Sequence, residues 1–117
     1  MVVALVDDLM FSSKIRTAAR QLSVPVTFVR SREAALSELR AHRPSMVILD
    51  LNGTRMDPLG TMADIKADAS LAGIPTIGFV SHVQTELIEA ARLAGVDEVM
   101  ARSAFTTGLA EILVRAR

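Results

Sequence analysis

The sequence predicts an α/β fold, a doubly wound parallel sheet of five strands. Five short apolar runs alternate with segments of helical spacing along the 117 residues. Continuous apolar runs of this length are typical of strands buried on both faces of a parallel sheet. Strict alternation with short connections then predicts the order βαβαβαβαβα, with helices on both faces of the sheet. The expected strands are residues 2–6, 24–29, 46–51, 74–80 and, more weakly, 98–101.

Apolar residues between these runs recur at steps of three and four, which is the spacing of an amphipathic helix. This spacing predicts helices after the first, fourth and fifth strands. The stripes are Phe11, Ile15, Ala18 and Leu22; Leu87, Ala90, Ala91 and Ala94; and Phe105, Leu109, Ile112 and Ala116.

Capping residues agree with this arrangement. Ser31 is predicted to be the N-cap of the second helix. Asp57 followed by Pro58 predicts the N-cap and first position of the third helix. Gly73 and Gly95 each follow a helical pattern and precede a strand, so we expect them to end the third and fourth helices.

Composition restricts the class of protein. The 13 basic and 13 acidic residues give a formal net charge of zero, which is atypical of a nucleic-acid-binding face. No apolar run reaches the roughly 18 to 20 residues of a membrane span, and the segment that starts at Met1 lacks the basic and long apolar regions of a secretory signal. Without cysteine, disulfides and thiolate metal sites are excluded. We therefore expect one cytoplasmic domain over residues 1–117, with no output domain and no nucleic-acid or membrane partner.

Charged and polar side chains follow the predicted strands. Asp7 and Asp8 come directly after the first run, and Asp50 ends the third. Ligands bind at the carboxyl ends of such strands, so the three carboxylates converge if the first and third strands are neighbours. Carboxylates so close repel one another unless a cation lies among them, and Mg²⁺ is the natural partner of such oxygen ligands. Ser81 and Arg102 follow the fourth and fifth strands, where a hydroxyl and a positive charge suit phosphoryl oxygens.

The same features, in this order along the whole chain, resemble the receiver domain of bacterial two-component response regulators. The resemblance implies a flavodoxin-like sheet with the strand order 2-1-3-4-5. It rests on the acidic pair Asp7-Asp8, the strand and loop 46–52, the loop and helix start at Met56-Asp57 and Leu59, and the turn 94–98.

The resemblance also implies a role for each site residue. Asp50 would accept a phosphoryl group from a phosphohistidine, donated by a histidine kinase or a phosphotransfer protein. Ser81 and Arg102 would contact that group, which brings roughly −1.5 to −2 charges. Such a protein is a phosphoacceptor and not an enzyme beyond its own phosphorylation and dephosphorylation. The expected Mg²⁺ ligands are Asp7, Asp8, Asp50 and the backbone carbonyl of Asn52.

The chain departs from the family pattern at four places. Arg102 replaces the usual Lys, and its planar fork is bulkier than an ammonium group. Ser103 replaces the Pro that commonly follows, so we expect a trans bond there. Val99 stands where the family has an aromatic residue that swings inward on activation. Gly53-Thr54 replaces an apolar-Pro pair, which should loosen the loop after Asp50.

Several residues have a simpler structural interpretation. Asp7 and Asp8 can cap the first helix, where carboxylates suit the helix dipole. Arg102 can be a counter-ion to the acidic residues without any phosphoryl chemistry. His82 can shade an acyl phosphate from water, or it can be an exposed loop histidine.

Two functions stay open on the sequence alone. A receiver phosphorylated on Asp50 would signal to a downstream protein partner through the fourth helix, the fifth strand and the fifth helix, with or without homodimerisation. A pseudo-receiver would bind partners independently of phosphorylation, which the residues Arg102, Ser103 and Val99 favour. Nucleotide-binding enzymes are unsupported, because the sequence has neither GxxxxGK[ST] nor GxGxxG.

Overall fold

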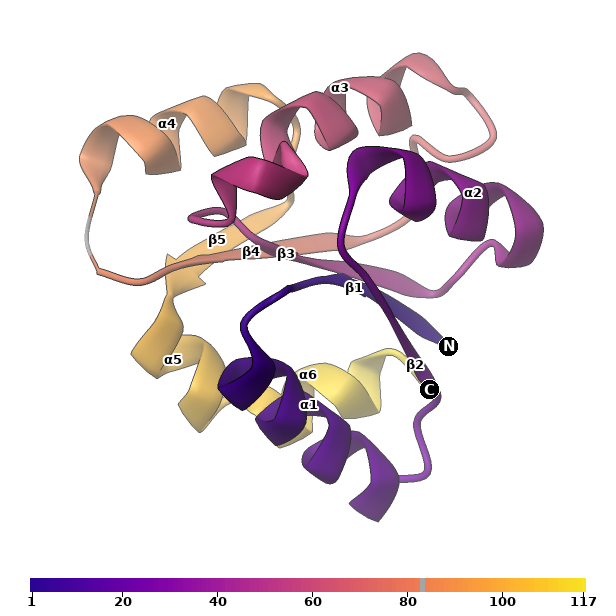
Figure 1. Cartoon of the computed structure of the whole chain (residues 1–117), viewed down its shortest axis with the longest axis vertical. Coiled ribbons are helices and arrows are strands. Elements are labelled where there is room, and N and C mark those ends of the chain that lie inside the picture. Colours follow the sequence, from indigo (N-terminus) through magenta and orange to yellow (C-terminus); the bar gives the residue numbers. More distant parts are fainter. Residues whose placement is uncertain (83) are drawn as a thin grey trace.

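Five parallel strands form one sheet in the order β2-β1-β3-β4-β5, which confirms the predicted fold class and order. The computed structural model describes residues 1–82 and 84–117 (Figure 1). The strands are β1 (Val2–Leu5), β2 (Val26–Val29), β3 (Met46–Asp50), β4 (Thr76–Val80) and β5 (Glu98–Ala101).

Helices cover both faces of this sheet. Figure 1 shows α1, α5 and α6 on one side and α2, α3 and α4 on the other. The helices are α1 (Leu9–Gln21), α2 (Arg32–His42), α3 (Pro58–Ala67), α4 (Thr85–Leu93), α5 (Arg102–Thr107) and α6 (Leu109–Arg115), and a 3-10 turn, η1, covers Thr54–Met56. None of the helices in the described ranges is both long and apolar enough to cross a membrane.

The strands are apolar on successive positions because both of their faces are buried. In β1, Val2 and Ala4 pack with α1 and α6, whereas Val3 and Leu5 pack with α2 and α3. All four side chains are fully buried. This double burial fixes the central strands, so the residues at their carboxyl ends have defined positions.

Several predicted helix ends are confirmed by their hydrogen bonds. The Ser31 hydroxyl accepts from the Ala34 N–H at 3.1 Å, and the Asp57 carboxylate accepts from the Gly60 N–H at 3.1 Å. Gly95 follows α4 with φ of 101°, a backbone conformation that glycine adopts without strain.

Two predicted ends are wrong. We expected Gly73 to end the third helix, but α3 ends at Ala67, where Asp68 turns extended and its carboxylate accepts from the Ser70 N–H and hydroxyl. The apolar stripe from Phe105 to Ala116 predicted one helix, but Gly108 divides it into α5 and α6. Glycine weakens a helix interior, and apolar spacing alone does not register that effect.

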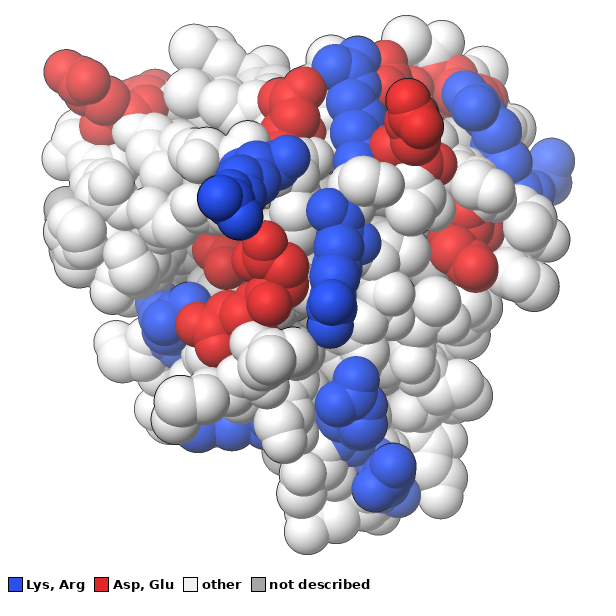
Figure 2. Space-filling model, viewed as in Figure 1, with Lys and Arg blue, Asp and Glu red and all other residues white. Residues whose placement is uncertain are grey.

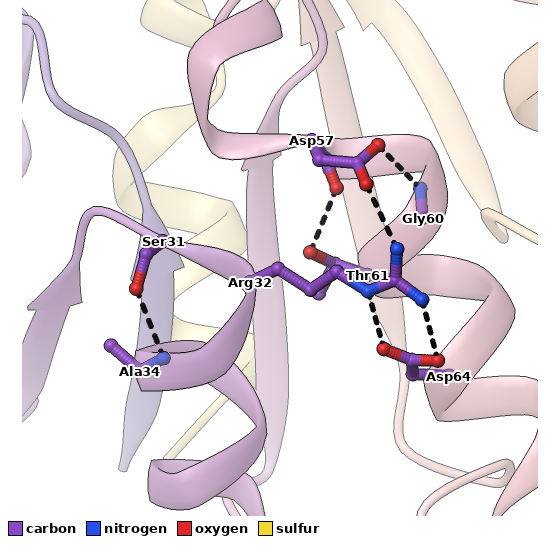
Figure 3. A network of polar contacts seen from close by, with 7 residues as sticks. All are labelled: Ser31, Arg32, Ala34, Asp57, Gly60, Thr61 and Asp64. Carbon is purple, nitrogen blue, oxygen red and sulfur yellow. Dashed lines mark hydrogen bonds and ion pairs between the residues drawn. The ribbon is translucent and has the colours of Figure 1, made fainter.

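A guanidinium group joins α2 to the start of α3. Arg32 donates from Nε and Nη2 to the two carboxylate oxygens of Asp64, and from Nη1 to Asp57 Oδ2 at 2.9 Å (Figure 3). The hydrogen bonds from Arg32 hold the pKa of Asp64 below its ordinary value, and the bond to Asp64 contributes most to raising the pKa of Arg32. We call Arg32, Asp57 and Asp64 the Arg32 cluster.

Candidate functional site

The candidate site lies where β1, β3 and β4 end, at one edge of the sheet. β1 and β3 are neighbours, which brings Asp8 and Asp50 to the same edge, as the sequence predicted. Asp50 is the last residue of β3 and pairs in register with Phe79 of β4. Figure 2 shows acidic side chains gathered near the middle of the visible face, with basic side chains beside them.

Asp50 is a buried carboxylate with one fixed oxygen. Its exposed fraction is 5%, and its Oδ1 accepts a hydrogen bond of 3.0 Å from the Asn52 N–H. Burial raises the pKa of Asp50, while the Asn52 N–H and Arg102 lower it and the Asp7 and Asp8 carboxylates raise it again. A buried strand-terminal carboxylate with a raised pKa is typical of a functional residue.

Arg102 approaches this carboxylate from the first position of α5. Its Nη2 lies 3.6 Å from Asp8 Oδ2 and 4.0 Å from Asp50 Oδ2, both longer than a hydrogen bond. The guanidinium carbon lies 4.6 Å from the centroid of the Phe11 ring and 5.7 Å from that of Phe79. We call Arg102, Asp8 and Asp50 the Arg102 cluster.

The two carboxylate oxygens of Asp8 have different partners. Its Oδ1 accepts a hydrogen bond of 3.0 Å from the Phe11 N–H and caps α1, while its Oδ2 faces Arg102. The capping interpretation is therefore confirmed for Asp8, and it leaves the second oxygen directed to the site. Asp7 is exposed, and α1 is capped by Asp8 alone.

The Asn52 side chain connects the loop after β3 to the loop after β4. Its Oδ1 accepts from the Ser81 N–H at 2.6 Å, and its Nδ2 donates to Gln84 Oε1 at 2.7 Å. Ser81 is thereby held beside the site by its backbone. Gln84 was not predicted, because it lies beyond the strand end and only the folded loop brings it to Asn52.

Two predicted modulators occupy different surroundings. His82 is exposed, and its Nδ1 lies 3.2 Å from the Ser81 hydroxyl. Val99 is half-buried in β5 and packs with the core on the α4 side of the sheet. Neither position tests the effect of these residues on an acyl phosphate or on signal transmission.

A pocket of about 520 Å³ opens beside the Arg102 cluster. The lining residues bring together charged, hydroxyl and apolar side chains from α1, α5 and the loop after β4. They are Asp8, Met10, Phe11, Lys14, Ser81, Arg102, Ser103 and Thr106. The peptide bond after Arg102 is trans, as predicted, since the described residues contain no cis peptide bond.

The donor chemistry at this edge suits a hard divalent cation. The pKa of Asp50 is raised by burial and further by Asp7 and Asp8, an excess of negative charge that a cation would relieve. Carboxylate and carbonyl oxygens are the donors that Mg²⁺ prefers. Over residues 1–82 and 84–117, however, no three His, Asp or Glu side chains converge closely enough to hold a metal ion. The predicted Mg²⁺ ligands therefore stay a prediction.

The sheet order places the chain among the doubly wound α/β proteins, a class whose members bind ligands at the topological switch point of the sheet. No protein-family model and no curated protein sequence matches the chain. Solved structures of response regulators do match it. The chain has the response-regulator receiver fold.

Three of these structures illustrate the similarity. The phosphorylated cyanobacterial phytochrome response regulator RcpA is 26% identical, with a TM-score of 0.80 over 96% of this chain and 86% of that one. A response regulator from Hahella chejuensis is 17% identical, with a TM-score of 0.86 over 97% and 91%. The Mn²⁺-bound response regulator Rcp1 is 18% identical, with a TM-score of 0.80 over 95% and 89%.

Proposed function

We propose that this chain is a receiver that accepts a phosphoryl group on Asp50 and signals through a protein partner. The observation that carries the proposal is that the Asp50 carboxylate is buried and has no hydrogen-bonded cationic partner among the described residues. This carboxylate is 5% exposed at the end of β3, with one oxygen fixed by Asn52 and the other 4.0 Å from the Arg102 guanidinium. A structural carboxylate so deeply buried would ordinarily have a hydrogen-bonded cationic partner.

The chemical step is transfer from a phosphohistidine. A carboxylate oxygen of Asp50 attacks the phosphorus, an O–P bond forms and the P–N bond breaks. The imidazole nitrogen keeps the electron pair of the broken bond and takes up a proton. Because the Asn52 N–H holds Oδ1, Oδ2 is the oxygen that we assign as the nucleophile.

Charge stabilisation is divided between the chain and a bound cation. Mg²⁺, held by Asp7, Asp8, Asp50 and the Asn52 carbonyl, would offset the negative charge of the phosphoryl group. Arg102 and the Ser81 hydroxyl would hold the remaining phosphoryl oxygens. RcpA is described as phosphorylated and Rcp1 as Mn²⁺-bound, which supports both parts by analogy.

Output is proposed through α4, β5 and α5 to a downstream protein. Leu93 at the end of α4 is 86% exposed, and such a partner would cover it. The phosphate donor in this scheme is a histidine kinase or a phosphotransfer protein. A second copy of the chain is a further partner for the same surface.

The first experiment is intact-mass spectrometry after incubation with acetyl phosphate and Mg²⁺. We expect one phosphoryl adduct on the native chain and none on Asp50→Asn, because the amide is a poor nucleophile. Removing Mg²⁺ with EDTA should also abolish the adduct. The matched control is Asp64→Asn, which removes a carboxylate that is paired with Arg32 instead of Arg102 and should leave the adduct unchanged.

The competing function is a phosphorylation-independent pseudo-receiver. It is favoured by one observation, the Arg102 guanidinium lying between Asp8 and Asp50. No adduct from folded protein, with a donor proven on another receiver, would overturn phosphoryl transfer and leave this function. An adduct that persists in Asp50→Asn would place the chemistry elsewhere.

A further inference from the structure

We propose that Arg102 is a built-in counter-cation of the acidic pocket, and that a divalent cation binds only by displacing it. The inference rests on the proposed function, because it concerns the same acidic residues. It adds a property of this chain: its affinity for Mg²⁺ is set by how firmly one guanidinium is held. Mg²⁺ binding by variants of Arg102 distinguishes failure of this inference from failure of the metal site.

The Arg102 guanidinium lies close to two carboxylates. Arg102 Nη2 lies within 4.0 Å of both Asp8 Oδ2 and Asp50 Oδ2. Asp50 is buried, so charges there interact more strongly than in bulk water. The guanidinium therefore already offsets part of the negative charge that would otherwise attract a metal ion.

Aromatic rings support the Arg102 guanidinium in this position. The guanidinium lies over Phe11, 4.6 Å from its centroid, within the range of a cation–π contact. Phe11, Phe79 and Phe105 pack together. The ring centroids are 4.7 Å apart for Phe11 and Phe79, 5.8 Å for Phe11 and Phe105, and 4.8 Å for Phe79 and Phe105. A planar guanidinium stacks on such rings, whereas a lysine ammonium at this position would not. The rings keep Arg102 in the pocket.

The hydrogen bonding of the Arg102 side chain is incomplete. Its Nε is buried and, over the described residues, has no hydrogen-bond partner. Its Nη2 is too far from either carboxylate for a hydrogen bond. Arg102 is thus held by charge and stacking and not by directed bonds, so a competing cation can displace it without breaking a hydrogen bond to Asp8 or Asp50.

The pocket beside the cluster gives the displaced side chain a place to go. Ser81, Ser103 and Thr106 are among its lining residues, as is Arg102 itself. Movement into this space would carry the guanidinium off the Asp8 and Asp50 carboxylates. It would also change its contact with Phe11, because that ring lines the same pocket.

The test compares Mg²⁺ binding by the native chain and by Arg102→Met, measured by titration calorimetry. We expect Arg102→Met to bind Mg²⁺ about fivefold more tightly, the upper end of what one partly exposed ion pair contributes. Arg102→Lys keeps the charge and loses the stacking, so its affinity should lie between the two. It also serves if Arg102→Met folds poorly.

A spectroscopic readout follows the guanidinium itself. The chain has four Phe and neither Trp nor Tyr, so its near-ultraviolet circular dichroism reports Phe alone. Phe11, Phe79 and Phe105 are three of the four. Mg²⁺ should change the Phe bands of the native chain and leave those of Arg102→Met unchanged.

Arg16→Met is the matched control. The Arg16 guanidinium lies 4.7 Å from the centroid of Phe28, a similar stack at a different place in the fold. This variant should bind Mg²⁺ as the native chain does, and its Phe bands should respond to Mg²⁺ in the same way.

The possible results distinguish the displacement of Arg102 from the existence of the Mg²⁺ site. Equal Mg²⁺ affinity in the native chain and Arg102→Met, or weaker binding by the variant, would overturn the inference and leave the metal site intact. Phe bands that ignore saturating Mg²⁺ in the native chain would overturn it as well. Binding by none of the variants would overturn the Mg²⁺ site and the inference together, while an adduct on Asp50 without Mg²⁺ would still support phosphoryl transfer.

Discussion

Two guanidinium groups in this molecule each face two carboxylates, and they are held in different ways. Arg32 donates hydrogen bonds to both oxygens of Asp64 and to Asp57, on the surface between α2 and α3 (Figure 3). Arg102 lies 3.6 and 4.0 Å from its carboxylates, without hydrogen-bond contact, and rests on aromatic rings. One arginine and two aspartates thus form a cluster closed by hydrogen bonds around Arg32, and a cluster without such bonds around Arg102.

The difference shows which cluster can exchange partners. In the Arg32 cluster, a competing ion would have to break several directed hydrogen bonds at once. In the Arg102 cluster, one carboxylate is buried and the guanidinium is incompletely bonded, an arrangement that is unfavourable for stability alone. We interpret the Arg32 cluster as structural and the Arg102 cluster as functional.

The largest effect is expected from the aromatic layer that supports Arg102. Phe79 is fully buried in β4 and contacts Phe11 and Phe105. Phe79→Ala removes this ring and leaves a cavity, so we expect a loss of about 3–5 kcal/mol in the free energy of unfolding. Urea denaturation followed by far-ultraviolet circular dichroism measures this loss.

Phe28→Ala is the control, because Phe28 is half-buried and lies under Arg16 at the edge of the sheet. The same substitution there should cost clearly less. Equal losses at both positions would show that the buried aromatic layer has no special weight in this fold.

The sequence predicted the fold more completely than the helix ends. The runs at 2–6 and 46–51 became β1 and β3 because burial on both faces makes a strand apolar at every position. The run at 24–29 shortened to Val26–Val29, and the stripe after Phe105 was divided at Gly108. Such ends depend on individual backbone conformations that a periodic pattern does not describe.

At the site, the sequence predicted the strand-end residues and missed their supports. Asp8, Asp50, Ser81 and Arg102 do lie together, because parallel strands bring their carboxyl ends to one edge, while their roles stay predictions. The contact of Arg102 with Phe11 depends on side-chain packing between α1 and α5, distant in the sequence. The Arg32 cluster was missed for the same reason.

The second prediction concerns Asp50, which is buried, and Asp64, which is paired with Arg32. Replacing each carboxylate with an amide should change the free energy of unfolding at neutral pH in opposite directions. Burial raises the pKa of Asp50, so the folded state binds this proton more tightly than the unfolded state. Stability from this group is then lost as pH rises through the folded pKa. Asp50→Asn should raise the free energy of unfolding at neutral pH in EDTA, by less than the Phe79→Ala loss.

The pH dependence distinguishes this effect from a packing change. The gain in Asp50→Asn should disappear as the pH falls below the unfolded value of about 3.9. Asp64→Asn should do the reverse, since Arg32 lowers the pKa of Asp64 and its stabilisation exists above the unfolded pKa. Urea denaturation at several pH values measures both, and equal signs for the two variants would contradict the comparison.

The smallest effect is expected from the Arg32 cluster, whose side chains are partly exposed to solvent. Arg32→Met keeps the aliphatic stem and removes the guanidinium, so it should lower the free energy of unfolding at neutral pH by less than Phe79→Ala does. Surface ion pairs are screened by salt, and Asp64 loses its charge in acid, so the loss should shrink at high ionic strength and low pH.

Arg40→Met is the matched control for this prediction. Arg40 is an exposed α2 residue with a single ion pair, 3.4 Å from Asp68, so its removal should cost less than that of Arg32. Thermal and urea denaturation in low and high salt compare the two variants. A loss in Arg32→Met that does not change with salt or pH would show that the charges of the closed network do not account for it.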